Sequence, residues 1–162
     1  MDMKKNITYK LLALVLILGT LSACRKDRVV GGTAVQSLSG QWWVKTKGSD
    51  GSQSGYYALN TFNTAANVPT EMWIDDGNHY YGLHSKITTN VSALTFSANA
   101  VDELYYGVKV TITDGKVLPG AVIAAGSKAK TDSIYFKAVF TGDPTVYTYS
   151  GYKRTGFTTD DH

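Results

Sequence analysis

Apolar and polar side chains alternate with a period of two along most of the chain. Successive side chains of a β-strand point to opposite faces, so this period is typical of strands with one dry face and one wet face. Such alternation is characteristic of antiparallel sheets. In segments 105–113 and 133–140 the apolar faces consist of Tyr106, Val108, Val110 and Ile112, and of Ile134, Phe136, Ala138 and Phe140.

Short turns separate the predicted strands. Two Asp-Gly pairs, Asp76-Gly77 and Asp114-Gly115, are each expected to close a hairpin, because glycine accepts positive φ. We therefore expect an all-β fold of about eight strands, either an antiparallel up-and-down barrel or a sandwich. A closed barrel has no edge strands, and its interior is either filled or holds one small ligand. The candidate strands cover residues 41–47, 54–63, 71–75, 79–89, 94–98, 105–113, 116–123, 132–140 and 145–157.

The first residues have the organisation of an export signal. A stub with three lysines precedes the apolar run 11–18, and Leu21-Ser22-Ala23-Cys24 follows. The run is shorter than the roughly 20 apolar residues that a spanning helix needs, so residues 1–23 are predicted to be a signal peptide. The Leu-Ser-Ala-Cys sequence resembles a lipobox, the site that the bacterial lipoprotein pathway reads. This resemblance implies cleavage before Cys24, lipidation of its sulfur and an outer-membrane anchor, with the domain facing the periplasm or the outside.

The mature chain is predicted to consist of a flexible tether, residues 24–39, and one barrel domain, residues 40–162. Cys24 is the only cysteine, which leaves no internal disulfide. The signal removes three lysines and one aspartate, and this lowers the formal charge from +3 to +1. With so small a charge and no basic run among aromatic residues, the sequence gives no indication of nucleic-acid binding. The expected partners are the membrane, through Cys24, and a small ligand.

Two segments at the ends of the predicted barrel resemble lipocalin-like (calycin) proteins. Gly40-Gln41-Trp42 opens the first strand and matches the Gly-x-Trp start of those barrels. In that superfamily a basic residue from the last strand packs over this tryptophan and closes one end of the barrel. The resemblance therefore implies that Arg154 stacks on Trp42, which would be a cation–π contact. The chain lacks the long helix that follows the barrel in many lipocalins.

Nearly the whole mature chain resembles a family of lipoproteins from Bacteroidetes that are described as lipid-binding putative hydrolases. The resemblance implies a lipocalin-like fold, and it brings no catalytic motif with it. The matching segments, in order along the chain, are Gly40–Val44, Thr61–Asn67, Glu71–Asp76, Val110–Pro119 and Gly151–Phe157.

A hydrolase would need catalytic residues. Glu71, Asp75 and His79 are weak candidates for acid–base chemistry, since the two carboxylates share one face of a strand and His79 follows the next turn. His79 and His84 are an odd number of residues apart, so a regular strand would point them to opposite faces and disfavour a metal site. No Gly-x-Ser-x-Gly motif is present, and Cys24 is assigned to the anchor. We therefore predict no metal, no cofactor and no catalytic residue.

Aromatic side chains are the candidates for a ligand cavity, because apolar walls with a few hydroxyl groups suit a lipid or another amphipathic molecule. The same residues could instead fill the barrel, or exposed rings could recognise a glycan or a protein. We expect a lipid-anchored barrel that binds a small hydrophobic or lipid ligand without catalysis; a glycan- or protein-binding module is the alternative, and a hydrolase is the third hypothesis. The candidate ligand-lining residues are Trp43, Tyr57, Trp73, Tyr81, Tyr106, Phe136 and Tyr149.

Overall fold

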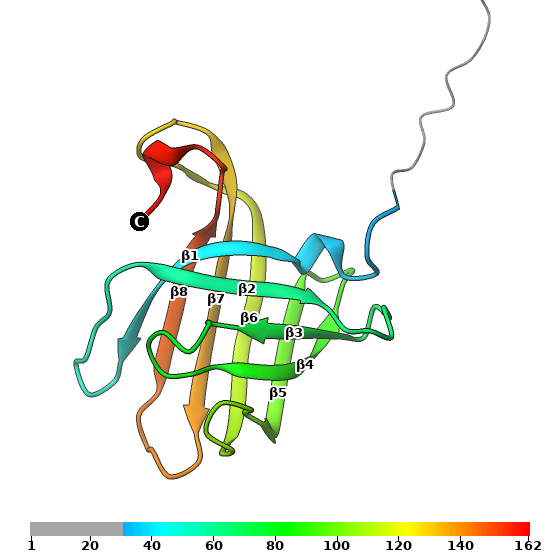
Figure 1. Cartoon of the computed structure of the whole chain (residues 1–162), viewed down its shortest axis with the longest axis vertical. Coiled ribbons are helices and arrows are strands. Elements are labelled where there is room, and N and C mark those ends of the chain that lie inside the picture. The colour runs from blue at the N-terminus through cyan, green and yellow to red at the C-terminus, as the bar shows by residue number, and fades with distance from the viewer. Residues whose placement is uncertain (1–30) are drawn as a thin grey trace, which may run out of the picture. The chain divides into compact units, whose positions relative to one another are not determined.

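The described part of the chain is a closed barrel of eight antiparallel strands in sequential order (Figure 1). This computed structural model describes residues 31–162, so the predicted signal peptide 1–23 and Cys24 lie outside the described residues. The prediction of an all-β, lipocalin-like up-and-down barrel is confirmed. The elements are η1 (Gln36–Leu38), β1 (Gly40–Gly48), β2 (Tyr57–Asn63), β3 (Glu71–Asp75), β4 (His84–Asn90), β5 (Thr95–Asp102), β6 (Lys109–Ile123), β7 (Lys130–Phe140), β8 (Tyr147–Lys153) and η2 (Thr158–Asp160).

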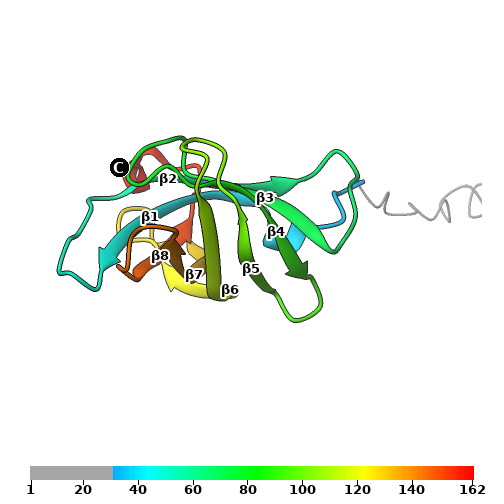
Figure 2. The same ribbon diagram turned by 90° about the horizontal axis from the view of Figure 1, so that it is seen from below.

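The barrel closes where β1 pairs with β8 over Trp42–Gly48 and Tyr147–Lys153. In Figure 1 strands β1–β4 run across the view and β5–β8 run along it, which makes two crossed layers, and Figure 2 shows these layers from below. Because neighbouring strands are antiparallel, every second connection lies at the same end of the barrel. We call the end that carries loops 49–56, 76–83, 103–108 and 141–146 the mouth, and the opposite end the base.

The predicted alternation places one face of each strand in the core. In β1, Trp42, Val44 and Thr46 are buried, whereas Gln41 and Lys45 are exposed. The same alternation recurs in β4, β6 and β7, so every side of the barrel contributes buried side chains, most of them apolar. The core therefore lies inside the barrel and includes Leu59, Met72, Ile74, Ile87, Phe96, Val110, Ile112, Val117, Ile134, Phe136 and Tyr149.

The predicted turn at Asp114-Gly115 is wrong, because β6 continues through it. The pairing of β6 with β7 shifts register between Thr113 and Lys116, which is a β-bulge. Asp114 has a φ of 58°, and Gly115 pairs with Phe96 of β5. A Cβ at Gly115 would lie 2.3 Å from the Phe96 carbonyl oxygen, so only glycine fits there. The Asp-Gly pair thus bends one long strand instead of reversing the chain.

The second predicted hairpin, at Asp76-Gly77, is wider than expected. The fourth strand begins at His84 and not at His79, and residues 76–83 form a loop. The Asp76 carboxylate accepts hydrogen bonds from the backbone N–H groups of Asn78 and Leu83, each at 2.9 Å. A buried side chain therefore organises this loop from inside, and a two-residue turn is replaced by a longer one.

The base is covered by the residues that precede β1. Val35 and Leu38 are fully buried, and the Leu38 carbonyl accepts a hydrogen bond of 2.7 Å from the Thr61 hydroxyl. Gly32–His162 form one compact unit. The packed part of the chain therefore begins a few residues before Gly40, within the segment expected to be tether.

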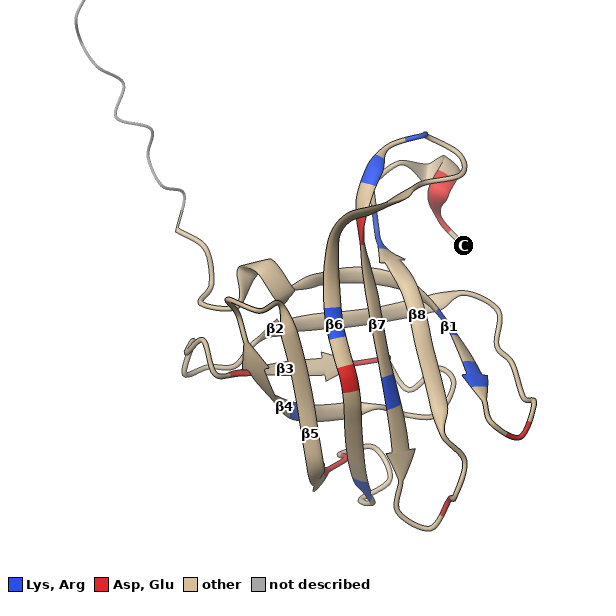
Figure 3. Ribbon diagram, turned by 180° about the vertical axis from the view of Figure 1, so that it is seen from behind, with Lys and Arg blue, Asp and Glu red and all other residues tan. Residues whose placement is uncertain are grey.

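Residues of opposite charge lie near one another on neighbouring strands such as β6 and β7 (Figure 3). On β6 and β7, Lys137 Nζ lies 2.9 Å from Asp114, and near the mouth Lys109 Nζ lies 2.6 Å from Asp102. These pairs are exposed to solvent, so each contributes little to stability.

Candidate functional site

Three polar atoms buried in the barrel have no hydrogen-bond partner among the described residues. They are Asp76 Oδ2, Ser85 Oγ and the Tyr149 hydroxyl, and all three side chains are fully buried. A buried polar atom without a partner costs about 1–3 kcal/mol. Such atoms are rare in folded proteins, where buried polar groups are usually hydrogen-bonded.

The pairing of β3 with β4 places two of these residues close together. Ile74 pairs with Ser85 and Asp75 pairs with His84, so Asp76 lies diagonally opposite Ser85. Since Ile74 faces inward, the period of two also turns Asp76 toward the core. Its Oδ1 accepts the two loop N–H groups, and this leaves Oδ2 unpaired.

Tyr149 reaches the same interior from β8. Its ring stacks on Phe136 with 4.3 Å between the ring centroids, and beside it the Tyr57 hydroxyl is hydrogen-bonded to Thr46. Burial, followed by the charges of Tyr57 and Asp76, raises the pKa of Tyr149. Burial also raises the pKa of Asp76 and of Tyr57. The interior thus holds neutral hydroxyl groups beside a carboxyl group that resists ionisation.

The mouth is closed above this cluster by a second carboxylate. Asp143 accepts hydrogen bonds from the hydroxyls of Tyr81 and Tyr147, the latter at 2.7 Å. The hydrogen bond from Tyr81 is the main reason why the pKa of Asp143 lies well below its usual range. The ring of Tyr81 also packs on Phe140 at 4.6 Å and on Tyr147 at 4.4 Å.

A pocket of about 470 Å³ opens beside this aromatic layer. Its volume lies within the range of small-molecule sites. Its walls combine aromatic rings with the carboxylate of Asp143, a composition that suits an amphipathic ligand. The lining residues are Tyr80, Tyr81, Tyr106, Val108, Phe140, Thr141, Gly142 and Asp143.

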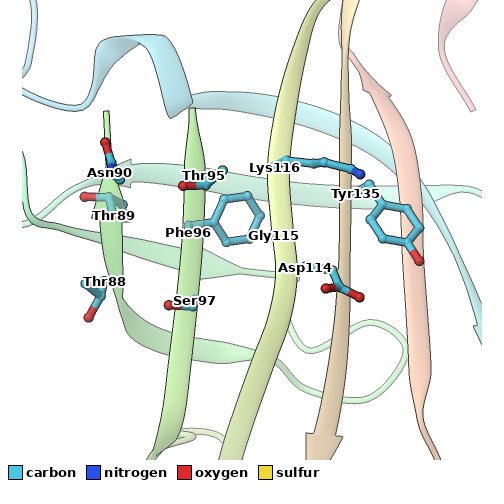
Figure 4. A pocket seen from close by; sticks show the side chains of 10 residues that line it. All are labelled: Thr88, Thr89, Asn90, Thr95, Phe96, Ser97, Asp114, Gly115, Lys116 and Tyr135. Carbon is cyan, nitrogen blue, oxygen red and sulfur yellow. The ribbon is translucent and has the colours of Figure 1, made fainter. Parts of the chain in front are cut away.

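A larger pocket, of about 700 Å³, lies elsewhere. Figure 4 shows it over β4–β7, around the bulge at Asp114-Gly115. Exposed polar side chains such as Thr88, Ser97 and Asp114 line it, and Lys116 extends over the Tyr135 ring. Two of its ten lining residues are aromatic, against four of eight at the mouth, so the mouth is the better candidate for a hydrophobic ligand.

The seven aromatic residues predicted to line a cavity divide into three groups. Tyr57, Phe136 and Tyr149 lie in the interior, and Tyr81 and Tyr106 line the mouth pocket. Trp43 and Trp73 point outward, because their strand neighbours Trp42, Met72 and Ile74 occupy the inward positions.

The expected contact between Arg154 and Trp42 is not formed. Lys153 Nζ lies 5.5 Å from the centroid of the Trp42 ring, whereas Arg154 lies 5.5 Å from that of Trp43. Trp42 and Lys153 are paired in register, and Arg154 follows on the opposite face. Arg154 also holds both oxygens of Asp161, at 2.8 and 2.6 Å. The barrel is therefore closed by Lys153, and Arg154 fixes the C-terminal residues to the outer wall.

The three weak catalytic candidates do not converge. Glu71 accepts a hydrogen bond of 2.6 Å from Thr64 and lies 3.3 Å from Lys86, while Asp75 accepts one of 2.7 Å from Tyr105. His79 lies on the mouth loop, where its Nδ1 is 3.0 Å from the Asp76 carbonyl. Each side chain thus has its own structural partner.

Residues 31–162 contain no group of three or more His, Cys, Asp or Glu side chains that could hold a metal ion. In this part of the chain no helix is long and apolar enough to cross a membrane.

Sequence reasoning missed Asp76, Ser85 and Asp143 as site residues. The signal for Asp76 was present, since it continues the inward series of Met72 and Ile74. For Asp143 no such signal existed, because its role depends on a loop that comes from the other side of the barrel.

The comparison with protein families gives an independent result. The family described as lipid-binding putative hydrolase matches residues 27–158, which is most of the chain and all of the barrel strands. No curated protein matches the sequence. The chain therefore belongs to the family of lipid-binding putative hydrolases.

Proposed function

We propose that this protein is a lipid-anchored lipoprotein of the cell envelope whose barrel binds a small hydrophobic or lipid ligand through the mouth, without catalysis. The observation that carries the proposal is the mouth pocket, whose aromatic walls lie above buried polar atoms that lack partners. Membership of a lipid-binding family supports the same function.

The mouth and the barrel interior together offer both kinds of contact that an amphipathic ligand needs. Tyr81, Phe140 and Val108 offer apolar surface, and each buried methylene group of a ligand contributes about 0.8 kcal/mol there. The unpaired atoms of Ser85 and Tyr149 offer hydrogen bonds that no other described residue takes. A ligand that uses both would be held by its chain and oriented by its polar end.

The anchor is proposed from the sequence of the first residues. Cleavage before Cys24 and lipidation of its sulfur would add more than one acyl chain, which is enough for stable anchoring. The barrel would then lie close to the outer membrane, on the periplasmic or the outer side, where lipids are at hand. In cells, Cys24→Ala should move the protein from the membrane fraction to the soluble fraction, and an unchanged membrane fraction would contradict the anchor.

Native mass spectrometry of residues 25–162, purified from bacterial lysate, tests the binding function. This segment contains the whole compact unit from Gly32 to His162. A bound lipid that is lost on delipidation and recovered when lipid is returned would support the proposal. A mass that stays unshifted with a panel of lipids would overturn it.

A second candidate function, recognition of a glycan or a protein, is favoured by one observation. Trp73, His84 and Tyr105 form an aromatic ridge on the outer wall, with ring centroids 5.1 and 5.4 Å apart. Asp75 lies beside this ridge and is hydrogen-bonded to Tyr105. Rings next to a carboxylate suit a sugar, so binding to a glycan array that Trp73→Ala abolishes would support this alternative.

A further inference from the structure

The polar end of the ligand can be assigned from the unpaired atoms in the barrel. We infer that the protein selects a lipid with an uncharged hydroxyl end, which Asp76, Ser85 and Tyr149 hold inside the barrel, over a fatty-acid carboxylate. The inference rests on the proposed lipid-binding function and specifies its ligand class.

The charges around the cluster disfavour an anion. The buried charged residues among those described are Asp76, Glu103 and Asp160, all of them acids, and no Lys or Arg is buried there. A fatty-acid carboxylate beside Asp76 would place two acids in one desolvated space, where both cannot be ionised. No buried cation among the described residues would offset the desolvation of such an anion.

A hydroxyl group has one donor and two acceptor sites, which match the hydrogen-bonding capacity of these three atoms. Its proton can be donated to Asp76 Oδ2, and its oxygen can accept hydrogen bonds from the hydroxyls of Ser85 and Tyr149. No charge is transferred into the interior, so the desolvation cost stays small. Glu103 does not compete for this ligand, because its carboxylate accepts the backbone N–H groups of His84, Tyr105 and Tyr106.

The ligand chain would extend toward the mouth. Tyr147 lies two residues from Tyr149 on β8 and is therefore one layer nearer to the mouth on the same face. Tyr81 and Phe140 pack around Tyr147 and line the mouth pocket. A hydroxyl end seated at Tyr149 thus places the following methylene groups among these rings.

The test compares two probes that differ only at the polar end, dodecanol and dodecanoate, on delipidated residues 25–162 at about pH 7.5. Titration followed by tryptophan fluorescence gives both dissociation constants, and native mass spectrometry gives the stoichiometry. We expect dodecanol to bind at least about tenfold more tightly, which corresponds to about 1.4 kcal/mol.

Three variants assign the preference to the cluster. Asp76→Asn keeps an oxygen for the loop N–H groups and places an amide donor at the position of Oδ2, so it should tighten dodecanoate about tenfold and remove the preference. Ser85→Ala and Tyr149→Phe remove atoms without protein partners, so both should stay folded and weaken dodecanol several-fold. Ser97→Ala, on the outer wall, is the matched control and should change neither constant.

The possible outcomes distinguish a wrong ligand class from a failure of the proposed lipid-binding function. If neither probe binds and no lipid co-purifies, the proposed function fails. If both probes bind equally and the three variants have no effect, the cluster holds water only and the inference is wrong, while the lipid-binding function stands. Tighter binding of dodecanoate to the unmodified protein would overturn the inference directly.

Discussion

The hydroxyl of Tyr81 donates a hydrogen bond to the carboxylate of Asp143, and the two residues come from opposite sides of the mouth. Tyr81 lies on the β3–β4 loop and Asp143 on the β7–β8 loop, which are four strands apart in either direction around the barrel. Tyr147 donates to the same carboxylate oxygen at 2.7 Å. A single carboxylate therefore joins the two sides of the mouth above the interior cluster.

Removing this link should make ligand exchange faster. Tyr81→Phe deletes the hydroxyl and keeps the ring on Phe140, so we expect dodecanol to enter and leave about tenfold faster with a smaller change in affinity, because one hydrogen bond to a charged group is lost. Stopped-flow fluorescence measures both rates. Tyr106→Phe, in the same pocket but 65% exposed, is the control. Equal rates in Tyr81→Phe and the unmodified protein would show that the mouth opens elsewhere.

The bulge in β6 should tolerate no side chain at Gly115. A Cβ there would lie 2.3 Å from the Phe96 carbonyl oxygen and 2.5 Å from its ring, so one of the two strands must shift. We expect Gly115→Ala to lower the free energy of unfolding by about 1–3 kcal/mol in urea denaturation. Gly55→Ala, which meets no atom within 4 Å, should change it by less than about 0.5 kcal/mol. A similar loss in both variants would contradict the packing argument.

The alternation of apolar and polar side chains predicted the fold because it shows, for each strand by itself, which face is buried. The alternation could not distinguish the two Asp-Gly pairs, because the same dipeptide can reverse the chain in a turn or form a bulge within one continuous strand. At Asp114-Gly115 the bulge is formed because Gly115 pairs with Phe96 of β5, which is distant in the sequence. At Asp76-Gly77 it is the buried carboxylate of Asp76, which holds the loop open to Leu83.

The site was less predictable than the fold for a related reason. The period of two along β1 and β3 implies that Trp43 and Trp73 point outward if Trp42 and Ile74 point inward. The period of two does not apply to loop residues. Asp143 lies on a loop and is hydrogen-bonded to Tyr81, which comes from a loop on the opposite side of the mouth. The prediction named Arg154 as the cation over Trp42, but this cation is Lys153. The two residues are adjacent in the chain, so their side chains point to opposite faces of the sheet.

The hydrogen bonds at the base give a prediction about stability. The indole N–H of Trp42 donates to the Thr61 hydroxyl at 2.9 Å, and that hydroxyl donates to the Leu38 carbonyl at 2.7 Å. Thr61→Val keeps the shape and leaves two buried groups unpaired, so the free energy of unfolding should fall by about 1–3 kcal/mol. Thr88→Val, at an exposed position on β4, is the control. Equal stability of Thr61→Val and the unmodified protein would mean that water replaces the hydroxyl.

Asp160 connects the C-terminal residues to the β6–β7 loop. Its carboxylate accepts hydrogen bonds from the backbone N–H groups of Gly126 and Ser127, at 3.0 and 2.9 Å. The hydroxyls of Ser127 and Thr155 also donate to it, at 2.5 and 2.6 Å. The hydrogen bond from the Ser127 side chain, followed by that from Thr155, lowers the pKa of Asp160 to about 2.

The carboxylate of Asp160 should make the stability of the folded protein depend on pH in the acidic range. The pKa of Asp160 is about 2 when the protein is folded and about 3.9 when it is unfolded, so its stabilising contribution is complete above about pH 4 and is lost as the pH falls toward 2. Asp160→Asn should therefore be less stable than the unmodified protein at neutral pH, and the difference should shrink between about pH 4 and pH 2. Urea denaturation at a series of pH values measures it, with Asp102→Asn, from the exposed pair with Lys109, as the control. A difference that stays constant down to about pH 2 would show that the hydrogen bonds of Asp160 do not depend on its charge.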